Sequence, residues 1–280
     1  MQLDLLDVFA GTGDLSGNPL AVVRGGEHLD TAAMQALTAW LGFSETTFLL
    51  PPDRVGADYR VRIFYPAGEL PFAGHPTLGS AYAWLASGGS PRTPGRVVQQ
   101  CPAGLIEVEV TGDNLAFKAP PLRRTGPLDD YQLAEAVRIA GIDPAMLVEA
   151  VHADNGPPWR LLRLASADAV LAALPVPRVE GVVDLALIGP HAAGAGVDWE
   201  VRAFFTKTGG VLAEDPVTGS LNAAAAQHLF ASGLARGSYV AGQGRMIGAD
   251  GRVEARQDGD GAVWIGGRVA LVSQGGRLFL

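Results

Sequence analysis

The sequence predicts an α/β (α+β) protein made of two pseudo-symmetric halves, each a curled, barrel-like sheet around a central helix. Three observations lead to this prediction. One stretch of the chain recurs 140 positions later, which is half of the 280 residues, and such repeats indicate duplicated structural units. Each copy reads as a strand, a glycine turn and a helix. Both helices are small and apolar on all sides, which is typical of buried helices, and a buried helix needs a sheet curled around it.

The repeat pairs VRIFYPAGELPFAGHPTLGSAYA (61–83) with VRAFFTKTGGVLAEDPVTGSLNA (201–223) without a gap. Eight of the 23 pairs are identical, whereas unrelated segments of average composition would share about two. A chance likeness between two segments rich in alanine and glycine is the alternative to an old gene duplication. The duplication is the better explanation.

Each copy can be interpreted element by element. The residues VRIFY and VRAFF are β-branched and aromatic, so they predict strands. Proline suits the first turn of a helix, where its missing N–H is harmless, so Pro76 and Pro216 predict the two helix starts. Asp215 before Pro216 is a typical N-cap. The helices should end at Gly88 and Gly233, since glycine adopts the backbone conformation that closes a helix.

The rest of the chain supplies the strands of the two sheets. Surface helices are expected at 31–42 and 129–142, and the proline-rich segment 118–130 is expected to link the halves. We therefore divide the chain into an N-terminal half, 1–120, and a C-terminal half, 121–280, whose last strand can return to the first half. The remaining strands are expected at LDLLDVFA, LAVVRG, TTFLLPP, RVVQQ and GLIEVEV, and then at LLRLAS, VVDLALIGP, VEARQ and AVWIGGRVALVSQGGRLFL.

Composition and charge exclude several classes of function. The net charge of −8 argues against nucleic acid as a partner, because phosphate binding requires a positive field. The start, MQLDLLDVFA, carries acidic residues where a secretory signal has basic ones, and no long apolar run predicts a membrane helix. The single cysteine, Cys101, excludes a disulfide within the chain. We expect a cytoplasmic protein with no nucleic-acid or membrane partner.

The two helix starts suggest a binding site for a negatively charged group. A helix N-terminus presents unpaired N–H groups and about half a positive charge, so it attracts anions. Two such ends facing each other across a domain interface would hold a carboxylate without lysine or arginine. The expected partner is therefore a small-molecule substrate with a carboxylate. The residues before the prolines are Gly74-His75 in one copy and Glu214-Asp215 in the other, and we expect them to differ because their tasks differ.

Four stretches resemble the signature sequences of a known family: GNPLAVV (17–23), FSETTFLLPP (43–52), AGHPTLGSAYAWL (73–85) and EDPVTGSLNAA (214–224). They are similar, in order and spacing and over essentially the whole chain, to those of the PhzF-like isomerases of phenazine biosynthesis, in the diaminopimelate epimerase superfamily. The resemblance implies a diaminopimelate epimerase-like fold, with the active site in the cleft between two similar halves. We further expect a homodimer.

The resemblance also implies roles for single residues. Related epimerases carry one cysteine at each helix start as a matched acid and base, but this sequence has cysteine at neither place. PhzF-like enzymes rely instead on a glutamate from the SET stretch, with a histidine and an aspartate at the helix starts. The residues that match these three catalytic positions are Glu45, His75 and Asp215. The residues expected to bind the substrate are Asn18, Gly74, Gly219 and Ser220.

Each of these residues also has a purely structural interpretation. Glu45 could be a surface carboxylate at a strand end, and His75 could cap a helix or belong to the core. Asp215 is a good N-cap whatever else it does, and Asn18 suits a turn. The Gly-Ser pair that follows Asp215 could simply be small residues at a tight helix start.

The function expected is that of a cofactor-independent isomerase or epimerase. Glu45 would take a proton from an acidic carbon near a carboxylate, and a proton would return to another carbon or another face. His75 and Asp215 would orient the substrate or relay protons. No cofactor is implied, because the sequence has no phosphate-binding loop, dinucleotide fingerprint or zinc motif. The alternatives are an amino-acid racemase, which the missing cysteines oppose, a non-catalytic binding protein that kept the cleft, and more remotely a hydrolase.

Overall fold

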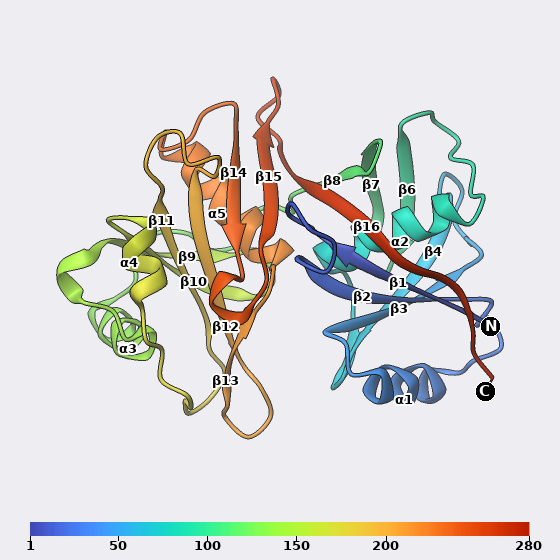
Figure 1. Ribbon diagram of the computed structural model, residues 1–280, viewed down its shortest axis with the longest axis horizontal. Coiled ribbons are helices and arrows are strands. Elements are labelled where there is room, and N and C mark those ends of the chain that lie inside the picture. Colours follow the sequence, from blue (N-terminus) through green and yellow to red (C-terminus); the bar gives the residue numbers. More distant parts are fainter. Residues whose placement is uncertain (280) are drawn as a thin grey trace. The chain divides into compact units, whose positions relative to one another are not determined.

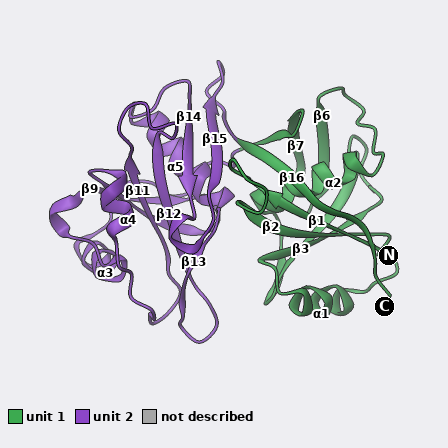
Figure 2. Cartoon of the chain, viewed as in Figure 1, with its two compact units in different colours: residues 1–118, 266–280 green, residues 119–265 purple. Residues whose placement is uncertain are grey.

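The computed structural model describes residues 1–279, which form two compact units (Figure 2). Unit 1 consists of residues 1–118 together with the C-terminal segment that starts at Gly266, and unit 2 consists of Ala119–Ile265. The chain enters unit 2 once and returns to unit 1 within its last strand, β16 (Val263–Arg277).

Unit 1 is a closed barrel of eight strands around one helix (Figure 1). Each strand is hydrogen-bonded to the next, and β16 pairs with β1 (Gln2–Val8) to close the ring. The strands between them are, in order, β2 (Asn18–Arg24), β3 (Glu45–Leu50), β4 (Tyr59–Tyr65), β6 (Arg96–Cys101), β7 (Gly104–Thr111) and β8 (Asn114–Lys118). The helix, α2 (Gly74–Ala86), packs against β1, β2, β3 and β8, and nine of its 13 residues are buried.

Gly79 lets α2 approach the barrel wall. A Cβ atom at this position would lie 2.4 Å from Leu20 Cδ2 and 3.0 Å from Val8 Cγ2. Both neighbours are fully buried, so they have little room to move. The close packing of α2 against β1 and β2 therefore depends on glycine at this place.

The helix predicted at 31–42 is confirmed as α1 (Thr31–Leu41), which covers an outer part of the unit 1 sheet. Asp30 caps its N-terminus, and Gly42 ends it with a left-handed backbone at φ 74°. Its buried residue Met34 belongs to a cluster with Phe48 of β3 and with neighbouring apolar side chains.

In unit 2, six strands, each hydrogen-bonded to the next, surround a second central helix, α5 (Gly219–Ala231). In order, the strands are β15 (Gly251–Gln257), β14 (Ser238–Gln243), β12 (Trp199–Thr206), β11 (Asp184–Pro190), β10 (Pro158–Leu164) and β9 (Leu147–Asp154). The helix packs against β15 at one end of the path and against β9 and β10 at the other, so the sheet curls around it. Nine of the 13 residues of α5 are buried.

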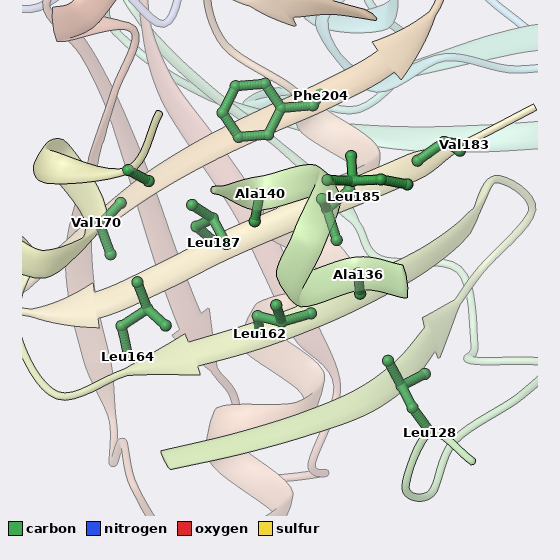
Figure 3. Close-up of a cluster of buried hydrophobic side chains, with 12 residues drawn as sticks. Leu128, Ala136, Ala140, Leu162, Leu164, Val170, Val183, Leu185, Leu187 and Phe204 are labelled. Carbon is green, nitrogen blue, oxygen red and sulfur yellow. The ribbon is translucent and has the colours of Figure 1, made fainter. Parts of the chain in front are cut away.

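Two helices, α3 (Asp130–Ala140) and α4 (Ala167–Ala172), cover the outer face of this sheet (Figure 3). The helix predicted at 129–142 is confirmed as α3, which begins with a capping box at Asp129. Leu162, Leu187 and other leucines of β10 and β11 are fully buried beneath the helices. Each such side chain contributes about 1.5–3 kcal/mol through burial. The short 3-10 helices of unit 2 are η1 (Pro144–Met146) and η2 (Arg245–Ile247).

Each central helix follows a hairpin, and the hairpins differ in length. A short strand pairs with the preceding long strand: β5 (Gly68–Leu70) with β4, and β13 (Leu212–Asp215) with β12. The long strands β4 and β12 start 140 positions apart, so the predicted alignment of the repeats holds there. In the hairpins, Ile63 pairs with Leu70 and Ala203 pairs with Asp215, which makes the second loop five residues longer.

The predicted superposition of Pro76 on Pro216 is therefore wrong. The central helices start at Gly74 and Gly219, which are 145 positions apart. Pro76 is the third residue of α2, whereas Pro216 precedes α5. Five extra residues correspond to more than one helical turn, so the two prolines mark different places.

The prediction that Asp215 caps the second helix is also wrong. Asp215 is the last residue of β13, and the N-cap of α5 is Thr218. Because the hairpin is longer, β13 runs as far as Asp215, and the helix starts further along the chain.

Candidate functional site

Two of the predicted catalytic residues meet at the start of α2. Glu45 is the first residue of β3, and His75 is the second residue of α2. Glu45 Oε2 lies 3.4 Å from His75 Nε2, and only 6% of the histidine side chain and 17% of the glutamate side chain are exposed. This distance is long for a hydrogen bond, so the two groups are in contact without a short bond.

His75 is held as a neutral imidazole. Burial lowers its pKa from 6.5 to about 3, and a hydrogen bond to the backbone of Pro19 opposes this shift only in part. Proline has no N–H, so the histidine must donate to the Pro19 carbonyl. Among residues 1–279, Nε2 has no hydrogen-bond partner. The donor is therefore Nδ1, and Nε2 presents its lone pair toward Glu45.

The Pro19 carbonyl is positioned by the loop between β1 and β2. Asp7 is buried, and its carboxylate accepts a hydrogen bond from the backbone N–H of Gly17 at 2.9 Å. A Cβ atom at Gly17 would lie 2.2 Å from the carbonyl oxygen of Val8, so glycine is needed for this close approach. The turn leads directly into Asn18, the fully buried first residue of β2.

In unit 2, Asp215 is held from the N-cap of α5. The hydroxyl of Thr218 donates a hydrogen bond to Asp215 Oδ2 at 2.6 Å. Such a short bond is typical of a hydroxyl that donates to a carboxylate. Asp215 therefore has a defined orientation just before the helix.

Ser220 is the second residue of α5, the place that His75 takes in α2. Its hydroxyl accepts a hydrogen bond from Trp159 Nε1 at 3.2 Å, and its carbonyl accepts one from Asn155 Nδ2 at 2.8 Å. Both donors are buried residues from the segment around the start of β10.

The structure gathers the predicted site residues into one group in each unit. Around the start of α2 lie Asn18, Glu45, Gly74 and His75. Around the start of α5 lie Asp215, Gly219 and Ser220. Their roles in catalysis and substrate binding stay predictions.

The central helices differ from the covering helices at their N-termini. The covering helices α1, α3 and α4 are capped by the side chains of Asp30, Asp129 and Ser166. In the described part of the chain, the N-cap residues of α2 and α5, Ala73 and Thr218, make no such bond. The first N–H groups of a helix need partners, so both central helix starts suit a negatively charged group.

A pocket of about 480 Å³ lies elsewhere in unit 1, beside α1 and β4, and none of the predicted site residues lines it. Its two arginines are already paired, Arg60 with Asp53 and Arg62 with Glu69, each at 2.7 Å. We therefore do not assign the site to this pocket.

Within residues 1–279, no group of three or more histidine, cysteine, aspartate or glutamate side chains is arranged to hold a metal ion. In the same part of the chain, no helix combines the length and the apolar character that a membrane span requires.

Several residues that hold the site in place were not predicted from the sequence. Thr218 carried a local signal, because threonine directly before a helix is a common N-cap. Asn155, Trp159 and Gln243 carried none, because they come from strands or loops far along the chain.

Comparisons with known proteins agree with the fold. A family model described as phenazine biosynthesis-like protein matches residues 6–275. The chain is 35% identical over 235 residues to a trans-2,3-dihydro-3-hydroxyanthranilate isomerase from Pseudomonas fluorescens. This match covers 82% of this chain and 80% of the relative. The chain is 36% identical over 177 residues to antisense-enhancing sequence 1 of Schizosaccharomyces pombe, where the match spans 61% of this chain and 60% of the relative.

A solved structure of a predicted epimerase from Pseudomonas aeruginosa is also similar. It is 31% identical, with a TM-score of 0.75 over 100% of this chain and 99% of that chain. The predicted fold class, with sheets curled around central helices, is confirmed.

Proposed function

Because the chain belongs to the phenazine biosynthesis-like (PhzC-PhzF) family, whose relatives include named isomerases, we propose that this isomerase moves a proton within a small substrate that bears a carboxylate. The proposed reaction needs no cofactor. Family membership supports the class of enzyme, and the arrangement of the site residues supports the mechanism.

The observation that carries the proposal is the contact between Glu45 and a neutral His75 at an uncapped helix start. A carboxylate that takes up a proton becomes neutral, and the neutral imidazole beside it adds no charge to the pair. The uncapped N–H groups of α2 favour an anion at the same place. A base next to an anion site suits the removal of a proton from a carbon near a carboxylate.

In the proposed step, Glu45 takes a proton from a carbon of the substrate and returns a proton to another carbon or another face. Once protonated, Glu45 can donate to the lone pair on His75 Nε2, which lies 3.4 Å from its Oε2. Burial keeps His75 from becoming charged, since its pKa is lowered to about 3. The proton therefore stays available on Glu45. A positioned general base contributes about 10²–10⁴-fold to the rate.

We assign Asp215 and Ser220 to the same reaction as groups that orient the substrate or relay the proton. Asp215 is held by the Thr218 hydroxyl at 2.6 Å beside the second uncapped helix start. Ser220 holds in α5 the place of His75 in α2, and it can offer its hydroxyl and backbone N–H to an anion.

For the substrate we propose a small cyclic, unsaturated carboxylate. A relative 35% identical to this chain is named for its action on trans-2,3-dihydro-3-hydroxyanthranilate. That compound combines a carboxylate with a partly reduced ring, which has carbon-bound hydrogens for a base to remove. It is therefore the first compound to try, followed by other cyclic, unsaturated amino carboxylates.

The test is to incubate the wild-type chain with trans-2,3-dihydro-3-hydroxyanthranilate in deuterated water and to follow the carbon-bound hydrogens by NMR. We expect an isomerised product that carries deuterium from the solvent. Binding of the compound without isomerisation or deuterium uptake would mean a binding protein that has lost the reaction.

A further inference from the structure

Gln243, the last residue of β14, is fully buried. It makes three hydrogen bonds to the segment that leads into α5 and a fourth to α5 itself. Its Nε2 donates to Thr218 Oγ1 at 2.9 Å and to the carbonyl of Asp215 at 3.1 Å. Its Oε1 accepts from the backbone N–H of Thr218 at 3.1 Å and from Asn222 Nδ2 at 2.8 Å. All the donors and acceptors of the amide are used. The reverse orientation of the amide would place N–H groups against N–H groups, so the orientation is fixed.

These bonds decide which way the Thr218 hydroxyl points. Its oxygen accepts from Gln243 Nε2, so its own proton is left to bond Asp215 Oδ2, 2.6 Å away. The bonds run in one direction, from the donating amide through the hydroxyl to the accepting carboxylate. Asp215 cannot rotate without breaking the last of them.

The backbone holds the same segment in place. Gln243 lies opposite Val201 on one neighbouring strand and opposite Gly251 on the other. At the next position, a Cβ atom on Gly244 would lie 2.5 Å from the carbonyl oxygen of Pro216. The end of β14 therefore fits closely against the segment between Asp215 and the helix.

The described residues of unit 1 contain the first part of this arrangement. Gln99 of β6 donates to Thr77 Oγ1 at 2.9 Å, and Tyr59 donates to Gln99 Oε1 at 2.9 Å. Thr77 and Asn222 are the fourth residues of α2 and α5, so a glutamine holds the first turn of the central helix in both units. Among residues 1–279, only the glutamine of unit 2 is linked onward to a carboxylate, because Thr218 bonds both Gln243 and Asp215. Attaching the helix to the sheet does not require that extension.

We propose that Gln243 and Thr218 are positioning residues, which hold the Asp215 carboxylate in the single orientation used during proton transfer. This inference rests on the proposed function, because it takes Asp215 as a group that acts on the substrate. Gln243 and Thr218 act through Asp215 and contact no reacting atom. A group oriented in advance needs less reorganisation during the reaction.

The test compares two substitutions of Thr218 with a matched control. Thr218→Val keeps the shape and removes the hydroxyl, and Thr218→Ser restores the hydroxyl. The control is Thr206→Val, which removes a hydroxyl of the same unit that accepts a hydrogen bond from Val183 N at 2.9 Å. Thermal unfolding of all variants shows how much of any effect is a general loss of stability.

Crystal structures test the positioning without any substrate. We expect the Asp215 carboxylate to leave its position in Thr218→Val and to keep it in Thr218→Ser and Thr206→Val. An unchanged Asp215 in Thr218→Val would overturn the inference, whether or not the wild type turns over a substrate. If the wild type shows no turnover and no exchange, the proposed function fails, and the crystal structures alone decide the positioning.

Kinetics with trans-2,3-dihydro-3-hydroxyanthranilate test the consequence. In Thr218→Val, kcat should fall by about 10- to 100-fold, the loss that corresponds to one hydrogen bond to a charged group, and KM should change by less than about threefold. Thr218→Ser should recover most of kcat, and Thr206→Val should match the wild type.

In an Asp215→Asn background, Thr218→Val should cause no further loss of kcat, because the effects of residues that act through one group are not additive. An equal loss in both backgrounds, or no recovery with serine, would show a merely structural role.

Discussion

Gly74 and Gly219 occupy equivalent places in the two units, since each begins the central helix four positions after its hairpin strand ends. The side chains that follow them are His75 and Ser220. The equivalent pair at the two helix starts is thus a histidine and a serine.

Asp215 has a different counterpart. It pairs with Ala203, whereas Leu70 pairs with the equivalent Ile63, so Asp215 corresponds to Leu70 at the end of the shorter hairpin. Glu45 and His75 come from β3 and α2, whereas Asp215 comes from the end of a hairpin. The ionisable groups of the two units thus lie on elements that are not equivalent.

Gly79→Ala should destabilise the protein by about 1–3 kcal/mol, because overpacking of a filled core costs that much. Its Cβ would lie 2.4 Å from Leu20 Cδ2 inside the barrel of unit 1. On an exposed helix the same change would stabilise by about 1 kcal/mol, so the sign of the effect is the test. Urea unfolding measures it. A Gly79→Ala protein as stable as the wild type would show that α2 does not approach β1 and β2 so closely.

Glu214, the neighbour of Asp215, should matter for stability. It pairs with Arg202 through bonds of 3.0 and 2.8 Å, and Arg202 also donates to the carbonyls of Val170 and Ala173 near α4. The side chains of Glu214 and Arg202 are only 8% and 5% exposed. Glu214→Ala should cost about 3–5 kcal/mol, because it leaves a buried charge without its partner.

The control for Glu214→Ala is Glu69→Ala in unit 1. Glu69 also pairs with an arginine, Arg62, at 2.7 Å, but these side chains are 30% and 24% exposed. Loss of a partly exposed pair should cost no more than about 1 kcal/mol. Equal losses of unfolding free energy in the two variants would contradict the importance of burial for the Arg202 pair.

His75 should make the protein less stable as the pH falls. Its pKa is lowered from 6.5 to about 3 by burial, so between these values the unfolded chain binds a proton that the folded chain does not. The free energy of unfolding should therefore fall by about 1.4 kcal/mol per pH unit in that range. His75→Asn removes the titrating group. Between pH 7 and pH 5, the free energy of unfolding of this variant should therefore fall by about 2 kcal/mol less than that of the wild type. Parallel stability profiles from urea unfolding would mean that His75 titrates normally in the folded protein.

Local signals in the sequence predicted the covering helices and the repeated strands. The helices α1 and α3 carry an aspartate N-cap and a closing glycine within their own segments, so their bounds could be inferred without knowledge of the fold. The strands β4 and β12 share a pattern of apolar residues at equivalent positions.

The five-residue shift between the repeats escaped prediction because it falls in a loop. The ungapped alignment matched Pro76 with Pro216 and Gly79 with Gly219, although neither pair is equivalent in the structure. One signal was available: Ser87 and Ser232, the C-cap residues of the central helices, are 145 positions apart. An alignment anchored at the helix ends would have required the gap.

The contacts within the site could not be derived from the sequence alone. Glu45 and His75 are 30 positions apart. The packing of α2 against β3 brings Glu45 Oε2 to 3.4 Å from His75 Nε2. The resemblance to a family implies roles for these two residues but does not give their contact. Gln243 lies 28 positions after Asp215 and stands in no motif, so its role emerges only from the hydrogen bonds.

The central claim, that Glu45 is the base, is tested most directly by solvent exchange in Glu45→Gln. Glutamine keeps the size of the side chain but cannot take a proton. The matched control is Glu107→Gln on β7, where the carboxylate is 51% exposed and pairs with Arg96. With trans-2,3-dihydro-3-hydroxyanthranilate in deuterated water, deuterium uptake into the substrate or product should fall by at least about 100-fold in Glu45→Gln. It should be unchanged in Glu107→Gln, and both variants should remain folded. Full exchange in a folded Glu45→Gln protein, together with its loss in Asp215→Asn, would contradict the account and make Asp215 the base.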